Sequence, residues 1–237
     1  MTATPLPNTT STPVAAPNRW RGLRNIITSQ EGILLLVIIV LMVGVGAAKP
    51  NFRAPNNLSD IFQSESYIAV AAVGMSILII SGNIDISVGS LVGVLAILSG
   101  TLSVNGFPGW LCWLIPILVA MLVGAINGFF VSFLRIQSIV VTLGMLSILK
   151  GGAIIVLGGT TIINMKPDFF LSQWDWLGIP TPIWLMIIAT VVGTLWMRYS
   201  ATGRAIYAVG GNAEAARLSG INTRRITMTA FIITVFV

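Results

Sequence analysis

The residues of this sequence that are best suited to chemistry lie in one short polar stretch between two apolar runs. It reads Ile80-Ser81-Gly82-Asn83-Ile84-Asp85-Ile86-Ser87-Val88-Gly89-Ser90. It offers an amide, a carboxylate and several hydroxyls, which can hydrogen-bond an uncharged polar molecule. A carboxylate can also take up a proton or an ion. Four side chains are therefore candidates for a binding site: Asn83, Asp85, Ser87 and Ser90.

The composition predicts an integral membrane protein. Of the 237 residues, 55% are hydrophobic and 8% are charged, whereas soluble domains carry about 25% charged residues. The net charge of +6 suits Lys and Arg held on the cytoplasmic side of a membrane, and we expect no nucleic-acid partner. With no histidine and one cysteine, we expect no disulfide within the chain, no metal site and no cofactor.

The two runs that flank the polar stretch, 67–80 and 88–103, are both shorter than the roughly 20 residues that a bilayer-crossing helix needs. Backbone outside a helix at membrane depth must be buried in protein or line a watery cavity. A short, glycine-interrupted pair therefore indicates a transport path. The alternative is a plain cytoplasmic turn over 82–87 with Asp85 solvated, or with Asp85 capping the helix that follows.

The rest of the chain predicts an all-α, polytopic transmembrane helix bundle, with a broken or short helix pair near residues 80–90. We expect residues 1–18 to be a disordered tail. The other expected spans are 32–48, 110–134, 138–157, 182–197 and 226–237. The last would extend only about 18 Å as a helix, so we expect the chain to end in mid-span.

Two features of these spans add candidates. Asn127 lies among the small residues Gly124, Ala125 and Gly128, which permit close helix approach; it joins the candidate path, although such an amide is more often glue between helices. Lys150, inside the span 138–157, either extends toward the headgroups or faces the cavity.

Charge counting orients the chain. If the N-terminus is cytoplasmic and the spans alternate, the inside segments hold nine arginines, against three Lys or Arg outside. This agrees with the positive-inside rule. The segment 198–225 then lies in the cytoplasm.

That cytoplasmic segment predicts a short helix near 212–220. Asn212 suits an N-cap, Glu214 complements the helix dipole in the first turn, and Gly220 suits the C-terminal end. A helix of two turns is too short to be stable alone, so we expect it to dock on a protein. Resting on the lipid surface is the alternative.

Glu214-Ala215-Ala216 followed by Gly220 resembles the start of the coupling loop of ABC-importer permeases. A fuller resemblance, to the ribose, xylose, rhamnose and autoinducer branch of bacterial ABC permeases, is carried by residues 82–90, 139–144 and 203–221. The resemblance implies that 19–237 is a permease domain, incomplete at its C-terminus, in the bacterial inner membrane. Family members continue for several more spans.

The resemblance also implies the partners and the task. Two permeases, alike or related, would pair in the lipid, and ATPase subunits would grip the coupling helix near 212–220. A periplasmic sugar-binding protein would deliver a monosaccharide-type solute. The coupling residues it implies are Gly203, Arg204, Asn212, Glu214, Ala215, Ala216, Arg217 and Gly220. The chain lacks the G-x-x-x-x-G-K-[ST] phosphate loop, so ATP hydrolysis would belong to a partner and this chain is not expected to be an enzyme.

Three other readings stay open. A secondary transporter or channel would use Asp85 as an ion or proton site. A membrane enzyme would need a catalytic cluster, and the sequence has no histidine and no carboxylates paired at helical spacing. A truncated product without transport activity is the third. No motif in the sequence identifies the sugar.

Overall fold

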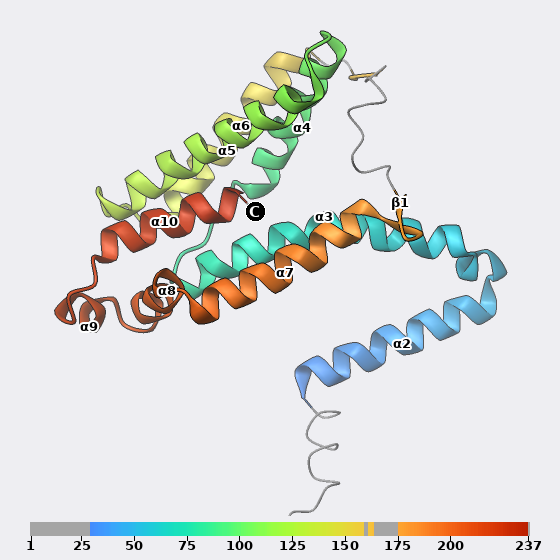
Figure 1. The fold of residues 1–237 in the computed structure, drawn as a ribbon, viewed down its shortest axis with the longest axis horizontal. Helices are drawn as coiled ribbons and strands as arrows, with labels where there is room; N and C mark the ends of the chain where they lie inside the picture. Colours follow the sequence, from blue (N-terminus) through green and yellow to red (C-terminus); the bar gives the residue numbers. More distant parts are fainter. Residues whose placement is uncertain (1–28, 159–160, 164–174, 237) are drawn as a thin grey trace, which may run out of the picture. The chain divides into compact units, whose positions relative to one another are not determined.

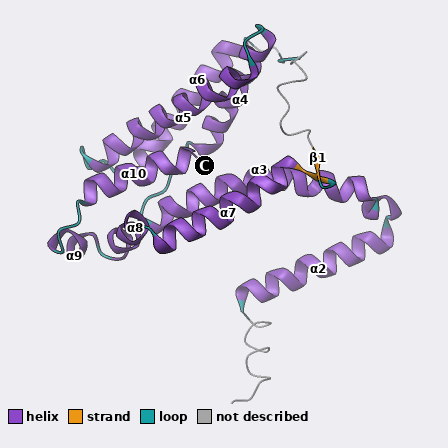
Figure 2. Ribbon diagram, in the orientation of Figure 1, coloured by secondary structure: helices purple, strands orange, loops and turns teal. Residues whose placement is uncertain are grey.

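The computed structural model describes residues 29–158, 161–163 and 175–236, and these are almost entirely helical (Figure 2). The predicted all-α fold is confirmed. The expected tail 1–18 lies outside the described residues. The one sheet in the described part is a hairpin of β1 (Asp175–Trp176) and β2 (Ile179–Pro180). Its two turn residues, Leu177 and Gly178, both have positive φ, as a two-residue type I′ turn requires.

The chain divides into two compact units, residues 1–58 and 59–237, and each is described by itself. The first contains α2 (Gln30–Ala48) and the short 3₁₀ helix η1 (Pro50–Arg53). The predicted helix over 32–48 is confirmed. It begins two residues earlier because the Ser29 hydroxyl caps it, accepting a hydrogen bond from the Gly32 N–H at 3.1 Å.

The helix before the polar stretch is longer than predicted. α3 (Pro55–Ile80) has 26 residues, so the expectation of a short helix over 67–80 was wrong. The polar residues before Tyr67 continue the helix, and serines among them bond back to its own carbonyls, as Ser64 Oγ does to Asp60 O at 2.6 Å. Proline at the first position also suits a helix start.

The helix after the polar stretch is short, as predicted: α4 (Val88–Val104) has 17 residues. It is followed by α5 (Gly109–Ser132), α6 (Ser138–Leu157) and α7 (Thr181–Tyr199). Within the described residues, four helical segments are long and apolar enough to cross a membrane, namely Asn57–Ile80, α5, α6 and α7.

Three helices follow α7, where the sequence analysis expected one short helix and a last span. They are α8 (Ala201–Gly211), α9 (Ala213–Leu218) and α10 (Thr223–Phe236). α8 was missed because its three glycines weaken a helical pattern. Ser200 starts it nonetheless, because its hydroxyl accepts a hydrogen bond from the Gly203 N–H at 2.8 Å.

Helix α10 lies beside α5 (Figure 1), and its residues belong to one apolar cluster of the larger unit and pack against the other. One cluster joins α3, α7, α8 and α10 through six buried side chains: Ile77, Leu78, Met197, Ile206, Ala230 and Phe231. The other joins α4, α5 and α6 through Leu91, Ala120, Val123 and Leu149, and Val235 of α10 packs against it.

Glycines bring α10 close to its neighbours. A Cβ on Gly74 of α3 would lie 2.5 Å from the Thr234 carbonyl oxygen, and the Thr234 hydroxyl donates to the Gly74 carbonyl at 3.0 Å. A Cβ on Gly124 of α5 would lie 2.5 Å from Cγ2 of Val235. The close approach predicted at Gly124 and Gly128 is confirmed, and the partner is α10.

We predict that Gly124→Ala destabilises the protein, by about 1–3 kcal/mol, because overpacking forces the helices apart. Gly144→Ala in α6 is the matched control, since nothing lies within 4 Å of its Cβ position. Thermal unfolding in detergent should show a lower Tm for Gly124→Ala alone. Equal Tm values for the two variants would contradict the close packing of α5 and α10.

Candidate functional site

The polar stretch is a true interruption between α3 and α4. After Ile80 the chain turns at Gly82, whose φ is +84°. The Asn83 N–H bonds to the Leu78 carbonyl at 3.2 Å, the closing bond of a glycine-based helix end. Only glycine adopts such a φ without strain, so Gly82 ends α3 at this position.

Asp85 lies at the centre of a buried polar cluster. It is 2% exposed, and Ser87 and Asn127 are fully buried. Asp85 Oδ1 accepts hydrogen bonds from the Ser87 N–H at 2.8 Å and the Ser87 hydroxyl at 2.5 Å. Asn127 Nδ2, from α5, lies 3.3 Å from both Asp85 Oδ2 and Ser87 Oγ. The interpretation of 82–87 as a solvated turn was therefore wrong.

The cluster has more acceptors than donors. Asn127 Oδ1 is buried and has no hydrogen-bond partner in the described part of the chain. Rotating the amide would not help, because its oxygen would then face the Asp85 carboxylate, and two acceptors cannot bond. Buried oxygens without a donor are costly. Chemically, the cluster suits a ligand that donates hydrogen bonds, such as a hydroxyl-bearing solute.

The other two candidates of the stretch do not join this cluster. Asn83 Nδ2 donates instead to Ser81, to its carbonyl at 3.3 Å and its hydroxyl at 3.1 Å. Ser90 lies in the first turn of α4 and is half-buried. Ser87 occupies the N-cap position of α4 but makes no side-chain cap bond. The Asp85 carboxylate accepts the Ser87 N–H at 2.8 Å instead, so it pairs a backbone group at the start of α4 as the capping alternative expected.

One residue that the sequence analysis missed ties α6 to the polar stretch. The Ser138 hydroxyl, at the start of α6, accepts a hydrogen bond from the Ile84 N–H at 3.3 Å. A serine at the first position of an apolar span is common as a helix-start residue, so its type alone did not distinguish it. Lys150, further along α6, is exposed.

Helix α8 contacts the end of α3 directly. Ile206, Val209 and Gly203 are buried on its inner face. A Cβ on Gly203 would overlap the Met197 carbonyl, and one on Gly210 would overlap the Ile80 carbonyl. Backbone therefore lies on backbone at the last residue before the polar stretch. On the outer side, the Arg204 guanidinium donates to the Tyr199 carbonyl at 2.8 Å.

Helix α9 has the ends that the sequence predicted. The Asn212 Oδ1 accepts from the N–H groups of Glu214 and Ala215 at 3.1 and 3.0 Å. At the other end Gly220 has φ +85°, and the Ile221 N–H bonds to the Ala216 carbonyl at 3.0 Å. Both predicted caps are confirmed, and both flank a helix of six residues.

Helix α9 presents one charged pair. Glu214 and Arg217 form an ion pair at 2.5 Å, with side chains 64% and 65% exposed, whereas Ala216 faces inward. The hydrogen bond from Arg217, followed by its positive charge, lowers the pKa of Glu214 below its usual value. An exposed pair contributes little to stability, so these charges are available to a partner.

Residues 57–237 match the family described as branched-chain amino acid transport system / permease component. The chain belongs to this family. Its members are transport components and not enzymes, and the family and the apolar helices make this permease a multi-pass protein of the bacterial inner membrane.

Several curated relatives resemble the permease over most of its length. It is 32% identical to Ribose import permease protein RbsC of Escherichia coli over 83% of the chain. It is 33% identical to L-arabinose ABC transporter permease protein AraH of Azospirillum brasilense over 92%. It is 34% identical to Autoinducer 2 import system permease protein LsrC of Yersinia enterocolitica over 86%.

The chain spans slightly under two thirds of these relatives, namely 63%, 64% and 57% of their respective lengths. No solved structure matches it significantly.

We predict that exchanging the partners of the buried pair reveals their interaction. Asn127→Asp places a second carboxylate beside Asp85 and removes its donor, which should cost about 3–5 kcal/mol. Adding Asp85→Asn to this variant restores one amide donor opposite one carboxylate acceptor, with the two groups exchanged between positions 85 and 127. The double variant should therefore have a higher Tm than Asn127→Asp alone, with a coupling of about 1 kcal/mol or more. Additive changes in stability would show that the two side chains do not interact.

The exposed ion pair gives a prediction for pH dependence. Because the folded pKa of Glu214 is lowered, its contribution to stability is present above the unfolded value near 4.5 and is lost as the pH falls through the folded value. The Tm difference between the wild type and Glu214→Gln should be small and constant from about pH 8 to pH 6, and should vanish near about pH 3. A difference that grows on acidification would contradict this.

Proposed function

We propose that this permease is the transmembrane subunit of an ATP-driven ABC importer that carries a monosaccharide-type solute across the inner membrane. The observation that carries the proposal is the contact between α8 and Ile80, the residue at which α3 stops and the polar stretch begins. A segment that faces the cytoplasm in the predicted orientation thus touches the stretch that holds the buried acceptors. The relatives are named for the import of ribose, L-arabinose and autoinducer 2, and these names support the class of solute.

The solute path is assigned to the polar stretch and to α5. Hydroxyl groups of a sugar donate hydrogen bonds, and Asp85 and the unpartnered oxygen of Asn127 accept them. Few and partly satisfied contacts suit a path, because the solute must also leave. The proposed path residues are Asn83, Asp85, Ser87, Ser90 and Asn127.

The partners are assigned to separate surfaces. Helix α9 offers Glu214 and Arg217 in the open, and a cytoplasmic ATPase subunit would bind there. The proposed coupling residues are Gly203, Arg204, Asn212, Glu214, Ala215, Ala216, Arg217 and Gly220. A second permease subunit would pair with this one in the membrane, and a periplasmic binding protein would deliver the solute. Residues 19–237 would act as one permease domain.

The packing suggests how a push on α9 would reach the path. Asn212 is the single residue that separates α8 from α9. Helix α8 in turn contacts α3 through the backbone at Gly210 and α7 through the backbone at Gly203. On its other side α9 leads into α10, which contacts α3 at Gly74 and α5 at Gly124. A displacement of α9 therefore acts on both elements that supply the path, the end of α3 and the helix of Asn127. A switch of this kind is a change between two packings.

The test combines uptake with copurification in cells that express the permease and its partners. Asp85→Ala should lower uptake of radiolabelled ribose or L-arabinose about tenfold or more, as expected from losing hydrogen bonds to a charged group, while the ATPase still copurifies. Glu214→Ala with Arg217→Ala should release the ATPase.

Two matched controls test the assignment. Asp60→Ala removes an exposed carboxylate of α3, and Glu65→Ala with Arg53→Ala removes two exposed side chains of opposite charge that lie far along the chain from α9. Both controls should leave uptake and copurification unchanged. Normal uptake by Asp85→Ala would refute the path, and retention of the ATPase by the α9 variant would refute the coupling site. If the wild type neither retains an ATPase nor imports a sugar, the importer itself is wrong.

A further inference from the structure

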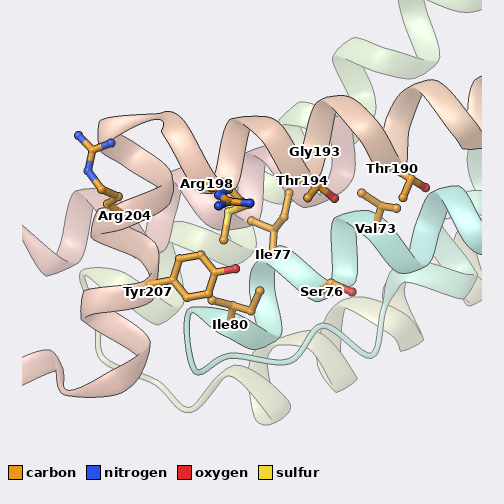
Figure 3. Close-up of a pocket in the computed structure, with 11 residues that line it drawn as sticks. Val73, Ser76, Ile77, Ile80, Thr190, Gly193, Thr194, Arg198, Arg204 and Tyr207 are labelled. Carbon is orange, nitrogen blue, oxygen red and sulfur yellow. The ribbon is translucent and has the colours of Figure 1, made fainter. Parts of the chain in front are cut away.

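A groove of about 560 Å³ lies where α3, α7 and α8 meet, away from the Asp85 cluster (Figure 3). Its volume falls in the range of small-molecule sites. None of the proposed path residues lines it. Figure 3 shows Arg204 and Tyr207 toward one end, Val73 and Thr190 toward the other, and Arg198 between them beside Ile77. The groove therefore has its basic side chains toward one end, whereas the hydroxyl groups of Ser76, Thr190 and Thr194 lie along the rest of it.

The basic side chains of the groove are Arg198 and Arg204, and in the part of the chain that the structure describes neither has an acidic partner. In the described residues the one ion pair is Glu214–Arg217, so neither Arg198 nor Arg204 is neutralised. The Arg198 guanidinium lies 5.5 Å from the centre of the Tyr199 ring, and Arg204 uses one nitrogen for the Tyr199 carbonyl. Since a guanidinium has five N–H donors, both retain donors for an anion.

The remainder of the groove is mostly apolar and runs along two membrane-crossing helices. Val73, Ile77 and Ile80 line it from α3, and Gly193 and Met197 line it from α7. A Cβ on Gly193 would lie 3.0 Å from Val73, whereas Met197 packs with Ile77 and Ile80 in one apolar cluster. The two helices therefore run parallel, and both end at the arginines. From Val73 to Ile80, the last residue of a segment long and apolar enough to cross a membrane, the helix rises about 10 Å.

We propose that this groove binds one anionic phospholipid, with its phosphate between Arg198 and Arg204 and an acyl chain along Val73 and Ile77. The distribution of charge in the groove matches this ligand. In a bilayer, the phosphate of a phospholipid lies level with the ends of the membrane helices, and its acyl chains lie alongside those helices. Basic pockets between transmembrane helices bind anionic headgroups in this way. A free anion would leave the apolar walls unused, and an acidic protein segment would have to enter at membrane depth. The inference goes beyond the proposed transport function and does not depend on it.

The test is lipid binding by native mass spectrometry of the full chain purified in mild detergent. Phosphatidylglycerol and phosphatidylcholine with the same acyl chains are the two probes. Wild type should prefer phosphatidylglycerol, and Arg198→Gln should weaken its binding about fivefold, the effect of one arginine near a headgroup. Arg224→Gln, with the same loss of charge outside the groove, is the matched control and should bind like wild type.

A second variant tests the apolar part. Thr194→Trp, which places a large side chain in the groove, should reduce adducts of both lipids, and inorganic phosphate should not compete. Arg204 is left unchanged because it also belongs to the proposed coupling residues. Equal phosphatidylglycerol binding by wild type, Arg198→Gln and Thr194→Trp would overturn the proposal, as would competition by phosphate alone or retention of a protein in place of lipid.

Discussion

The need to satisfy backbone and charge at membrane depth shapes the centre of this permease. Asp85 is buried, and it is tolerated because it accepts hydrogen bonds from Ser87 and Asn127. These bonds require α4 to start directly after Ser87 and α5 to pass beside it. Two further backbone groups of the stretch are paired, since the Gly82 N–H donates to the Ile79 carbonyl and the Ile84 N–H donates to the Ser138 hydroxyl. The interruption is therefore a built feature, because irregular backbone in a membrane must be paired internally.

Around this centre, α10 acts as the shared packing partner. Phe231 is fully buried between α3, α7 and α8, while Val235, one helical turn on, packs against the cluster of α4, α5 and α6. The glycines of α3 and α5 set how closely it approaches. The packing of the apolar clusters and the position of the polar stretch therefore depend on each other. Neither α3, which leads into the stretch, nor α5, which carries Asn127, can shift without moving α10.

Local patterns predicted much of this fold. The apolar runs located α4, α5, α6 and α7 to within a few residues, and the caps of α9 were readable because Asn212 and Gly220 act on adjacent backbone. The sequence did not predict the length of α3, because the first turns of this helix are polar. Their helical conformation is seen only in the structure, where Ser64 bonds to the carbonyl of Asp60 one turn earlier. The meeting of Asp85 with Asn127, 42 residues apart in the chain, depends on packing, which no local pattern encodes.

The glycines of α8 have a mechanical consequence. Where side chains separate two helices, rotamer changes absorb small displacements. At Gly203 and Gly210 no side chain intervenes, so α8 and the ends of α7 and α3 form one stiff block. Between α8 and α10, the chain can bend most easily at the extended residue Asn212 before α9 and at Gly220 after it. If α9 is displaced, as proposed for the coupling site, the backbone at Asn212 and Gly220 is where it can turn, and the stiff block beside it would carry the displacement to the ends of α3 and α7.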